Sequence, residues 1–341
     1  MKILFFADLH MCPRASIIDK WGTEFPMRLE NCIKTINWLE RLAEEEHCDY
    51  IINLGDFFDK PDLSSETITA SKKIKWSAIK HYSLVGNHDA SISNLTFNST
   101  NSLLSENHEI IAEPKMLELN DCEICFLPYV IESAREPLDS YFGARTNKPR
   151  IIVSHNDIKD IQLGPVISKT GFPLAEIEAN CDLFLNGHLH NGHRVNEKVI
   201  NLGNITGKDF GEDAFKYTHS VVILDTKTLA LNFIENPNAF NFYKIQVESE
   251  QDFDVFNTLK PGAVLSIKCD VTMLEKTKSL LNTLLDKVIA SRIIITRSYE
   301  ETIEPLAVDL SIDHLARFVE CCKENIENSA LLEEELTEVC K

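Results

Sequence analysis

Five short apolar runs in the first 190 residues each end directly in polar residues that can bind metal ions. They cover residues 2–7, 50–54, 82–85, 150–154 and 182–185. Such runs are typical of buried strands, and the carboxyl ends of strands in an open sheet are where ligands bind. We therefore expect an α/β fold that brings all five polar clusters to a single site.

The clusters supply carboxylates, imidazoles and one amide. In chain order they are Asp8 and His10, Asp56 and Asp59, Asn87 with His88 and Asp89, His155, and His188 with His190. One cluster alone is weak evidence, because a Gly-Asn-His-Asp segment is also an ordinary turn composition. All five, in order and at strand ends, favour a metal site over chance.

Helical patterns separate the early runs, and strands at hairpin spacing follow later. An amphipathic helix is predicted over 29–42 and a second helix over 64–79. Further strands are expected at 123–127, 198–201, 220–225 and 229–234. This order of elements predicts a mixed α/β sandwich.

The pattern changes near residue 238. Residues 242–297 have the pattern strand, helix, strand, helix, strand, with the second helix over 273–289. Two more helical patterns follow, at 313–324 and 331–340. We predict three parts: a catalytic domain 1–238, a small α+β capping domain 239–300 and a helical tail 301–341.

The chain is acidic, with 53 acidic and 34 basic residues and a net charge of −19. This argues against loose, charge-driven binding to nucleic acid, but not against a site where bound cations supply positive charge. No apolar run reaches the roughly 18 residues of a membrane span, so no membrane partner is expected. The first apolar run ends in charge at Asp8, too soon for a signal peptide. We expect a cytoplasmic protein.

Ten cysteines are present, and Cys122 and Cys125 have the two-residue spacing of a zinc pair. No second pair follows at the spacing of a zinc finger, and both residues lie in an alternating apolar stretch. We predict that they are strand residues and that the cysteines stay reduced in the cytosol.

The set of ligands suits two cations. Carboxylate and imidazole together favour manganese, iron or zinc, whereas magnesium prefers an all-oxygen set. Two such cations need a bridging carboxylate, for which Asp56 is the candidate. The predicted division assigns one cation to Asp8, His10 and His190, and the other to Asn87, His155 and His188.

His88 is left over from this ligand count. Two cations would lower the pKa of water toward neutrality and would hold the oxygens of a phosphate. His88 could then protonate the leaving alkoxide, with Asp89 orienting its ring. These two residues are the predicted catalytic pair.

Together the motifs resemble the complete signature of calcineurin-like metallophosphoesterases, which implies a four-layer α/β/β/α sandwich. The resemblance rests on Asp8-x-His10, Gly55-Asp56-x-x-Asp59, Gly86-Asn87-His88-Asp89, His155 and Gly187-His188-x-His190. Within that superfamily the chain resembles SbcD-type DNA repair nuclease subunits. The aromatic Phe58 before Asp59, the size and order of elements in 242–297, and the tail at 305–341 carry this finer resemblance.

The finer resemblance implies a two-manganese nuclease of DNA repair or recombination. The chain is compact beside cellular relatives, and its size alone suggests a minimal or phage-encoded version. The resemblance implies exonuclease action on duplex ends, endonuclease action on single strands or hairpins, and an SMC-like ATPase of the SbcC type docked on the tail. It also implies a homodimer formed through helices near 64–79 and 92–105, although the Ser-, Asn- and Thr-rich composition of 91–105 equally fits a loop.

Two other functions stay open at this point. The motifs fit a metallophosphatase or a small-molecule phosphodiesterase acting on cyclic nucleotides or nucleotide pyrophosphates equally well. A scaffold that has lost catalysis is the third reading, against which the intact ligand set and His88 speak. The hundred residues after 236 favour the nuclease.

Overall fold

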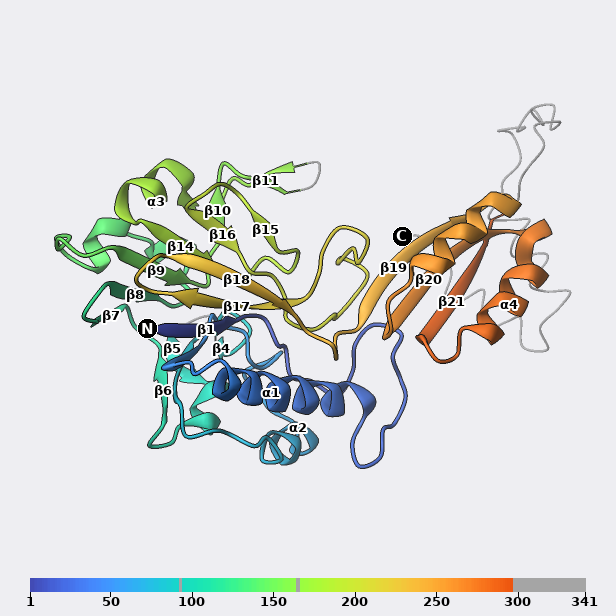
Figure 1. Cartoon of the computed structure of the whole chain (residues 1–341), viewed down its shortest axis with the longest axis horizontal. Coiled ribbons are helices and arrows are strands. Elements are labelled where there is room, and N and C mark those ends of the chain that lie inside the picture. The colour runs from blue at the N-terminus through green and yellow to red at the C-terminus, as the bar shows by residue number, and fades with distance from the viewer. Residues whose placement is uncertain (92–93, 164–165, 297–341) are drawn as a thin grey trace, which may run out of the picture. The chain divides into compact units, whose positions relative to one another are not determined.

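The computed structural model describes residues 1–91, 94–163 and 166–296. The predicted helical tail 301–341, with its patterns at 313–324 and 331–340, lies outside the described residues. Figure 1 shows the order of the elements along the chain.

Two six-stranded sheets form most of the molecule. The first has the order β18 (Ala230–Glu235), β17 (Ser220–Asp225), β1 (Lys2–Phe6), β2 (Tyr50–Asn53), β3 (Lys80–Leu84), β6 (His108–Ile111). The second has the order β15 (His193–Arg194), β16 (Val199–Asn201), β14 (Leu183–Asn186), β9 (Arg150–Ser154), β8 (Glu123–Leu127), β7 (Lys115–Glu118). In each sheet four neighbouring strands run parallel, and antiparallel strands lie beside them.

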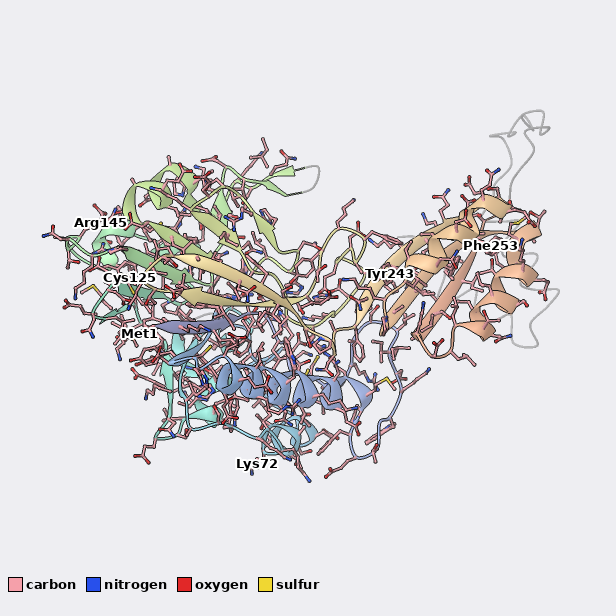
Figure 2. The ribbon with its side chains drawn as sticks, viewed as in Figure 1. Met1, Lys72, Cys125, Arg145, Tyr243 and Phe253 are labelled. Atoms are coloured by element: carbon pink, nitrogen blue, oxygen red, sulfur yellow. The ribbon has the colours of Figure 1, made fainter. Side chains whose placement is uncertain are left out.

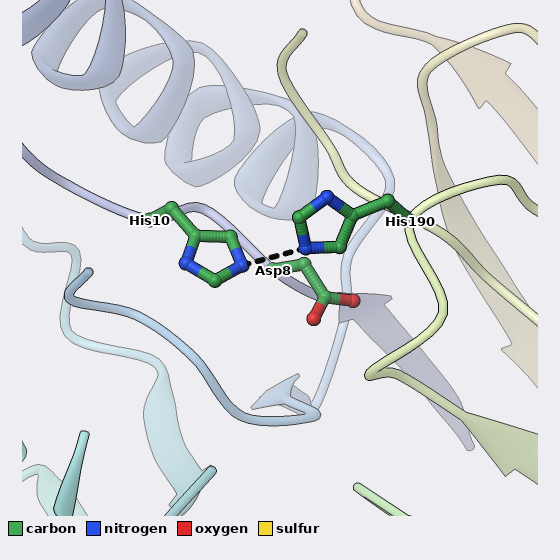
Figure 3. A group of neighbouring side chains, drawn as sticks. All are labelled: Asp8, His10 and His190. Atoms are coloured by element: carbon green, nitrogen blue, oxygen red, sulfur yellow. Dashed lines mark hydrogen bonds between the residues drawn. The ribbon is translucent and has the colours of Figure 1, made fainter. Parts of the chain in front are cut away.

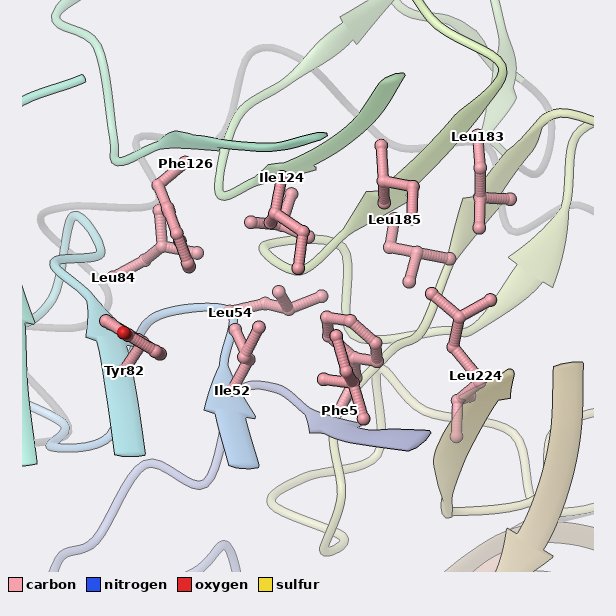
Figure 4. Close-up of a cluster of buried hydrophobic side chains, with 14 of the residues drawn as sticks. Phe5, Ile52, Leu54, Tyr82, Leu84, Ile124, Phe126, Leu183, Leu185 and Leu224 are labelled. Atoms are coloured by element: carbon pink, nitrogen blue, oxygen red, sulfur yellow. The ribbon is translucent and has the colours of Figure 1, made fainter. Parts of the chain in front are cut away.

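The two sheets pack face to face through one apolar layer (Figure 4). Phe5, Ile52 and Leu84 contribute to this layer from the first sheet, and Ile124 and Leu185 from the second. Burial of each such side chain stabilises the fold by about 1.5–3 kcal/mol. Because side chains alternate along a strand, the residues between them point to the outer faces.

Helices cover both outer faces. Leu4 and Phe6 of β1 pack against α1 (Met27–Glu45), and α2 (Ser65–Ser71) lies in the same apolar cluster through Ala70. On the other sheet, Phe184 packs beside Ile177 of α3 (Leu174–Asn180). The layers are therefore α, β, β and α, which confirms the predicted fold class (Figure 1).

A third sheet forms in residues 241–296. Its three parallel strands are β19 (Asn241–Val247), β20 (Ala263–Asp270) and β21 (Val288–Thr296), and α4 (Leu274–Thr283) connects the last two. Tyr243 on β19 and Phe253 in the 3₁₀ helix Glu250–Thr258 belong to its own apolar cluster (Figure 2). The predicted boundaries at 238 and 300 stay predictions.

Short ladders complete the description. They are β4 (Ala90–Ser91) with β5 (Asn94–Asn98), β10 (Ile158–Lys159) with β13 (Phe172–Pro173), and β11 (Gln162–Leu163) with β12 (Val166–Ile167). Cys122 and Cys125 lie at β8 and are buried on opposite faces of the second sheet. They cannot share a metal ion; the prediction of a strand residue is confirmed for Cys125, whereas Cys122 lies one residue before β8.

Three predicted helices differ in the structure. The helix predicted over 64–79 ends at Ser71, because two side chains of α1 bind the backbone that follows: Asn37 accepts from the Lys75 amide and Glu40 from the Ser77 amide. The helix predicted over 273–289 ends at Thr283, because Val288 pairs with Ala263 as a strand.

The segment 92–105, implied as a dimer helix, also differs. Its described part contains β5 and the 3₁₀ helix Ser99–Leu103. Its Ser, Asn and Thr side chains bond to nearby backbone, as when the Asn98 carboxamide accepts from the Asn101 amide. Such local bonds compete with helix formation.

Candidate metal centre

The five polar clusters meet at the carboxyl ends of β1, β2, β3, β9 and β14. The backbones of their loops are directly bonded: the Asp8 amide donates to the Gly55 carbonyl at 3.1 Å, and the His10 amide to the Asp56 carbonyl at 2.9 Å. The His188 amide donates to both carboxylate oxygens of Asp8 at 3.0 and 3.1 Å. These bonds fix the clusters relative to one another.

Within the described residues, three overlapping groups of side chains could each hold a metal ion. In each group the ligand atoms lie within 4.8 Å of one another. The groups are Asp8 with His10 and His190, His10 with Asp56 and His88, and Asp56 with His155 and His188.

The first group comes from β1 and from the loop after β14. The Nε2 atoms of His10 and His190 lie 2.9 Å apart, and the Asp8 carboxylate lies beside them (Figure 3). Asp8 and His10 are fully buried. Two imidazole nitrogens and a carboxylate that converge in this way are the ligands expected for manganese, iron or zinc.

The group assigned to the second cation comes from the loops after β2 and β3 and from the second sheet. His155 Nε2 lies 3.2 Å from Asp56 Oδ2 and 3.1 Å from the Asn87 side-chain oxygen. His188 Nδ1 lies 3.0 Å from the same Asn87 oxygen. All the side chains assigned to the second cation therefore converge.

Asp56 connects the two groups. Its Oδ2 atom lies 3.6 Å from His10 Nε2 and 3.2 Å from His155 Nε2, while its Oδ1 atom accepts from the His88 amide at 2.8 Å. One carboxylate oxygen thus faces an imidazole of each group. This is the placement that a bridging ligand requires.

Each of the four imidazoles has a second contact behind it. His155 Nδ1 donates to the Leu54 carbonyl at 2.7 Å, whereas the other three rings face carboxylates. The pairs are His10 Nδ1 with Asp59 at 3.3 Å, His188 Nε2 with Asp157 at 3.2 Å, and His190 Nδ1 with Glu212 at 3.4 Å. Such partners fix the orientation and tautomer of metal-binding histidines.

The sequence reasoning missed Asp157 and Glu212. Asp157 had a usable signal, since it lies two residues after His155 at a predicted strand end. Glu212 lies in an irregular segment, where no periodicity or motif spacing marks it. Its carboxylate is nevertheless buried, with 2% of the residue exposed.

Arg28 was missed as well. It lies in the first turn of α1, is fully buried, and donates to the Leu9 carbonyl at 2.7 Å and to the Gly207 carbonyl at 3.1 Å. Arg28 therefore joins the loop of His10 to the segment that carries Lys208. The available signal was its position one residue before the predicted helix 29–42 and four before Cys32, which places it on the apolar face of a helix that begins earlier.

The backbone at the centre is strained. Asp8, His10, Asp56 and His188 have positive φ angles of 53°, 46°, 52° and 73°. These four are half of the eight non-glycine residues with positive φ in the described part of the chain. Strained backbone of this kind persists where the surrounding structure over-determines it, and it clusters at functional sites.

Two glycines make room for the ligands. A Cβ atom at Gly86 would lie 2.1 Å from Asp56 Oδ1, and one at Gly55 would lie 2.3 Å from His155 Nδ1. Gly55 also has a φ of +107°, which L side chains rarely adopt. A side chain at either position would displace a ligand.

Burial and charge set the protonation of the centre. Burial raises the pKa of the Asp8 carboxyl and lowers the pKa of His10 to about 3, which keeps that imidazole neutral. Burial opposes the charged forms of Asp56 and His155 too, but their mutual attraction outweighs it: the pKa of Asp56 falls and that of His155 rises to about 9. A cation would replace the proton that this pair shares.

His88 and Asp89 are placed differently from the prediction. His88 Nδ1 donates to the Asp59 carbonyl at 3.0 Å, so the main chain of the second motif orients this ring. The buried Asp89 carboxylate instead accepts from the Gly86 amide at 3.0 Å and the Phe58 amide at 2.9 Å. The prediction that Asp89 orients His88 through its side chain is wrong, because those two amides bind its carboxylate oxygens.

The donor set fits two divalent cations: buried carboxylates, four imidazoles and one amide oxygen, with Asp56 between the two groups. The fold and this centre together define a metal-dependent phosphoester hydrolase. The family model for calcineurin-like phosphoesterases matches residues 1–224. The chain therefore belongs to the calcineurin-like phosphoesterase family, whose members use divalent metal ions.

One solved structure similar to the chain is the crystal structure of the nuclease MPE from Pseudomonas putida. It is 20% identical in sequence, covers 50% of this chain and 72% of its own, and has a TM-score of 0.24. No curated protein matches the sequence. In the part of the chain that the structure describes, no helix has the length and apolarity to cross a membrane.

Proposed function

We propose that this protein is a DNA nuclease that hydrolyses phosphodiester bonds with two divalent cations, manganese in the first place and magnesium, iron or zinc as alternatives. The position of Asp56 between two imidazole groups carries this proposal, because it is what a two-cation centre for in-line displacement needs. Asp8, His10 and His190 would hold one cation, and Asn87, His155 and His188 the other.

The chemistry is divided between the cations and the chain. When bound, the cations supply a polarised water and neutralise the charge of the phosphate. His88 supplies the proton for the leaving alkoxide: with Nδ1 bonded to the Asp59 carbonyl, its Nε2 is the atom left for proton transfer. Asp59, Asp157 and Glu212 hold the imidazoles of His10, His188 and His190 in place.

The surroundings of the centre favour a large substrate. A surface pocket of about 1040 Å³ is lined by Asn87 and His88 and reaches to Lys60 and Phe97. A phosphate monoester would not need this space, since about 300–1,000 Å³ already surrounds most of a drug-sized ligand. The same site could hydrolyse a small-molecule phosphodiester, and this remains the second candidate.

The wider role is also a proposal. We infer a subunit of an SbcC/SbcD-type repair or recombination complex in the bacterial cytosol or a phage-infected cell. It would act on duplex ends as an exonuclease and on single strands or hairpins as an endonuclease. The SMC-like ATPase would dock on the tail 301–341, and a second copy of the chain would form a homodimer. The resemblance in motif two and in residues 241–296 supports these inferences.

The test is digestion of end-labelled duplex and single-stranded DNA beside a chromogenic phosphodiester, with manganese, magnesium or chelator. We expect manganese-dependent cutting of DNA that is lost with chelator. Hydrolysis of the small ester without DNA cutting, even when the candidate ATPase is added, would contradict the nuclease and support the second candidate.

A further inference from the structure

Two unlike sets of residues line the pocket beside the metal centre. We call Asn87, His88 and Lys208, which lie next to the ligands, its polar end, and Phe97, Asn98 and Asn101, from β5 and the 3₁₀ helix that follows, its Phe97 end. The polar end belongs to the centre described above. The end at Phe97 has no part in holding a cation, because it offers an aromatic ring and two amides in place of carboxylates and imidazoles.

We propose that this end of the pocket binds an unpaired nucleobase of the substrate strand, stacked on Phe97, while the neighbouring phosphodiester lies at the metal centre. The proposal rests on the proposed nuclease function and specifies its substrate: a single-stranded segment or a frayed end of nucleic acid. A base inside a duplex is already stacked on its neighbours and must leave the stack before it can contact a protein ring.

Phe97 is one of the most exposed large apolar residues in the described part of the chain. It lies on β5 with 72% of its surface exposed, although burial of an aromatic ring stabilises a fold. Single exposed apolar residues are ordinary on protein surfaces. Phe97 differs from them because it lines a pocket that also contains the candidate catalytic histidine.

The backbone ties Phe97 to the centre. Two residues along the chain, the Ser99 amide and hydroxyl both donate to the Asp89 carbonyl, at 2.8 and 3.0 Å. Asp89 directly follows His88 and is itself fully buried. These bonds hold the segment that carries Phe97 next to the loop of His88, as an aromatic platform for a base requires.

The pocket carries lysines as well as acids. Lys60 and Lys208 line it together with Asp59 and Asp62, and the two lysines can meet the phosphates on either side of the reacting bond. Lys208 is held toward His10 by its ion pair with Asp59, with Nζ 3.4 Å from His10 Nδ1. The charges nearest a bound phosphate act on it most strongly, so these lysines can contact a polyanion although the chain as a whole carries a charge of −19.

The side chains around Phe97 favour stacking over the reading of base edges. The Asn98 carboxamide is already engaged, since its oxygen accepts from the Asn101 amide at 3.0 Å and its nitrogen donates to the Leu95 carbonyl at 2.7 Å. The Asn101 side chain donates to the Thr96 carbonyl at 3.1 Å. We therefore expect little preference for one base over another.

The experiment compares Phe97→Ala with Phe97→Trp and a control, Phe233→Ala. Phe233 is 47% exposed on β18, and it does not line the pocket. Each protein is assayed with manganese on a single-stranded oligonucleotide, on an abasic strand of equal length and on a chromogenic phosphodiester. Binding of a hydrolysis-resistant phosphorothioate single strand is measured by fluorescence anisotropy.

We expect Phe97→Ala to weaken binding of the oligonucleotide and raise its KM by about 5- to 150-fold, the worth of one stacked base. Activity on the abasic strand and on the small phosphodiester should be unchanged. Phe97→Trp should restore binding, and Phe233→Ala should behave as wild type.

The inference would be overturned if Phe97→Ala lost activity equally on all three substrates, or lost none on any of them. It would also be overturned by a wild-type protein that neither binds nor cuts the oligonucleotide. A fourth contrary outcome is that Phe97→Ala converts a wild-type dimer to a monomer in size-exclusion chromatography. The last would assign the surface to a second copy of the chain. A wild-type protein that binds the oligonucleotide through Phe97 without cutting it would contradict the proposed nuclease function but support the base-binding site.

Discussion

The sandwich, which ends with β18, and the small sheet of residues 241–296 both contain neighbouring parallel strands, yet the candidate ligand groups of the described residues all lie in the sandwich. All ten histidines of the described residues lie before residue 220, and none lies in 241–296. In the small sheet, the acids that follow the strands bind local backbone instead: Asp252 accepts from the Glu248 and Ser249 amides, and Asp270 from the Thr272 amide.

This difference shows what a strand end needs in order to become a site. In the sandwich, Asp8 and Asp56 also accept backbone amides, but from other loops, at a distance of 180 residues for His188 and 32 for His88. These bonds between distant segments hold the carboxylates beside four imidazoles. In the small sheet Asp252 and Asp270 accept amides of their own turns and stabilise those turns.

The largest expected effect is at the bridge between the two groups. Asp56→Ala should remove both cations and reduce hydrolysis by more than the 10- to 100-fold that loss of a supporting partner typically costs. Metal content by atomic spectroscopy and manganese-dependent hydrolysis of a small phosphodiester would measure this. The matched control is Asp252→Ala, whose carboxylate only caps a turn; equal loss in both variants would contradict the comparison.

His88 should behave differently from the ligands. His88→Ala should keep both cations and lower kcat by about 10²- to 10⁴-fold, because it removes proton donation to the leaving group. Metal content and kcat must be measured on the same preparation. If the variant loses its metal as Asp56→Ala does, His88 is a ligand and its assigned role is wrong.

A core substitution in the small sheet should lower the stability of the protein without changing its activity. Leu265→Ala removes a fully buried side chain from the core of the small sheet and should lower the free energy of unfolding by about 2–5 kcal/mol. Hydrolysis of a small phosphodiester by the folded protein should not change. Chemical denaturation and steady-state kinetics test this, and a large loss of kcat would show that the small sheet supports the centre directly.

A smaller effect is expected at Glu212, behind His190. Glu212→Gln keeps the size of the side chain but removes its charge, and should weaken metal binding by about 10- to 100-fold. Isothermal titration with manganese would measure it. Glu235→Gln, an exposed carboxylate paired with Lys260, is the control; the prediction fails if both variants bind manganese as the wild type does.

The smallest effect is a pH dependence confined to the sandwich. Burial, aided by His81, lowers the pKa of His108 to about 3, below the unfolded value of about 6.5. The unfolded state then binds the proton more readily, so stability is full above pH 6.5 and is lost as the pH falls toward 3. The free energy of unfolding of the wild type should fall between pH 7.5 and 5.5, and His108→Gln should make this fall smaller by about 1.4 kcal/mol, measured by urea denaturation. If the fall in the free energy of unfolding is the same in His108→Gln as in the wild type, other titratable groups cause it.

The local sequence pattern was sufficient to predict the strands that precede the ligands, and the order of the ligands along the chain, whereas the outer strands β6 and β7 were not predicted. The alternation of β1, with Phe5 inward and Leu4 outward, follows from the two-residue period of a strand and needs no knowledge of its partners. Parallel strands then force Asp8, Asn87 and His155 to a common edge. The strand pattern and the motifs that follow the strands are therefore sufficient to predict the site.

The remaining features depend on contacts between distant segments of the fold. The helix after Ser64 stops at Ser71 because side chains of α1 capture the backbone that follows, and the helix after Met273 stops because β21 pairs with β20. Asp157 and Glu212 acquire their roles only from the imidazoles that the fold brings beside them. Contacts between segments far apart in the sequence depend on packing, and a local pattern carries no record of them.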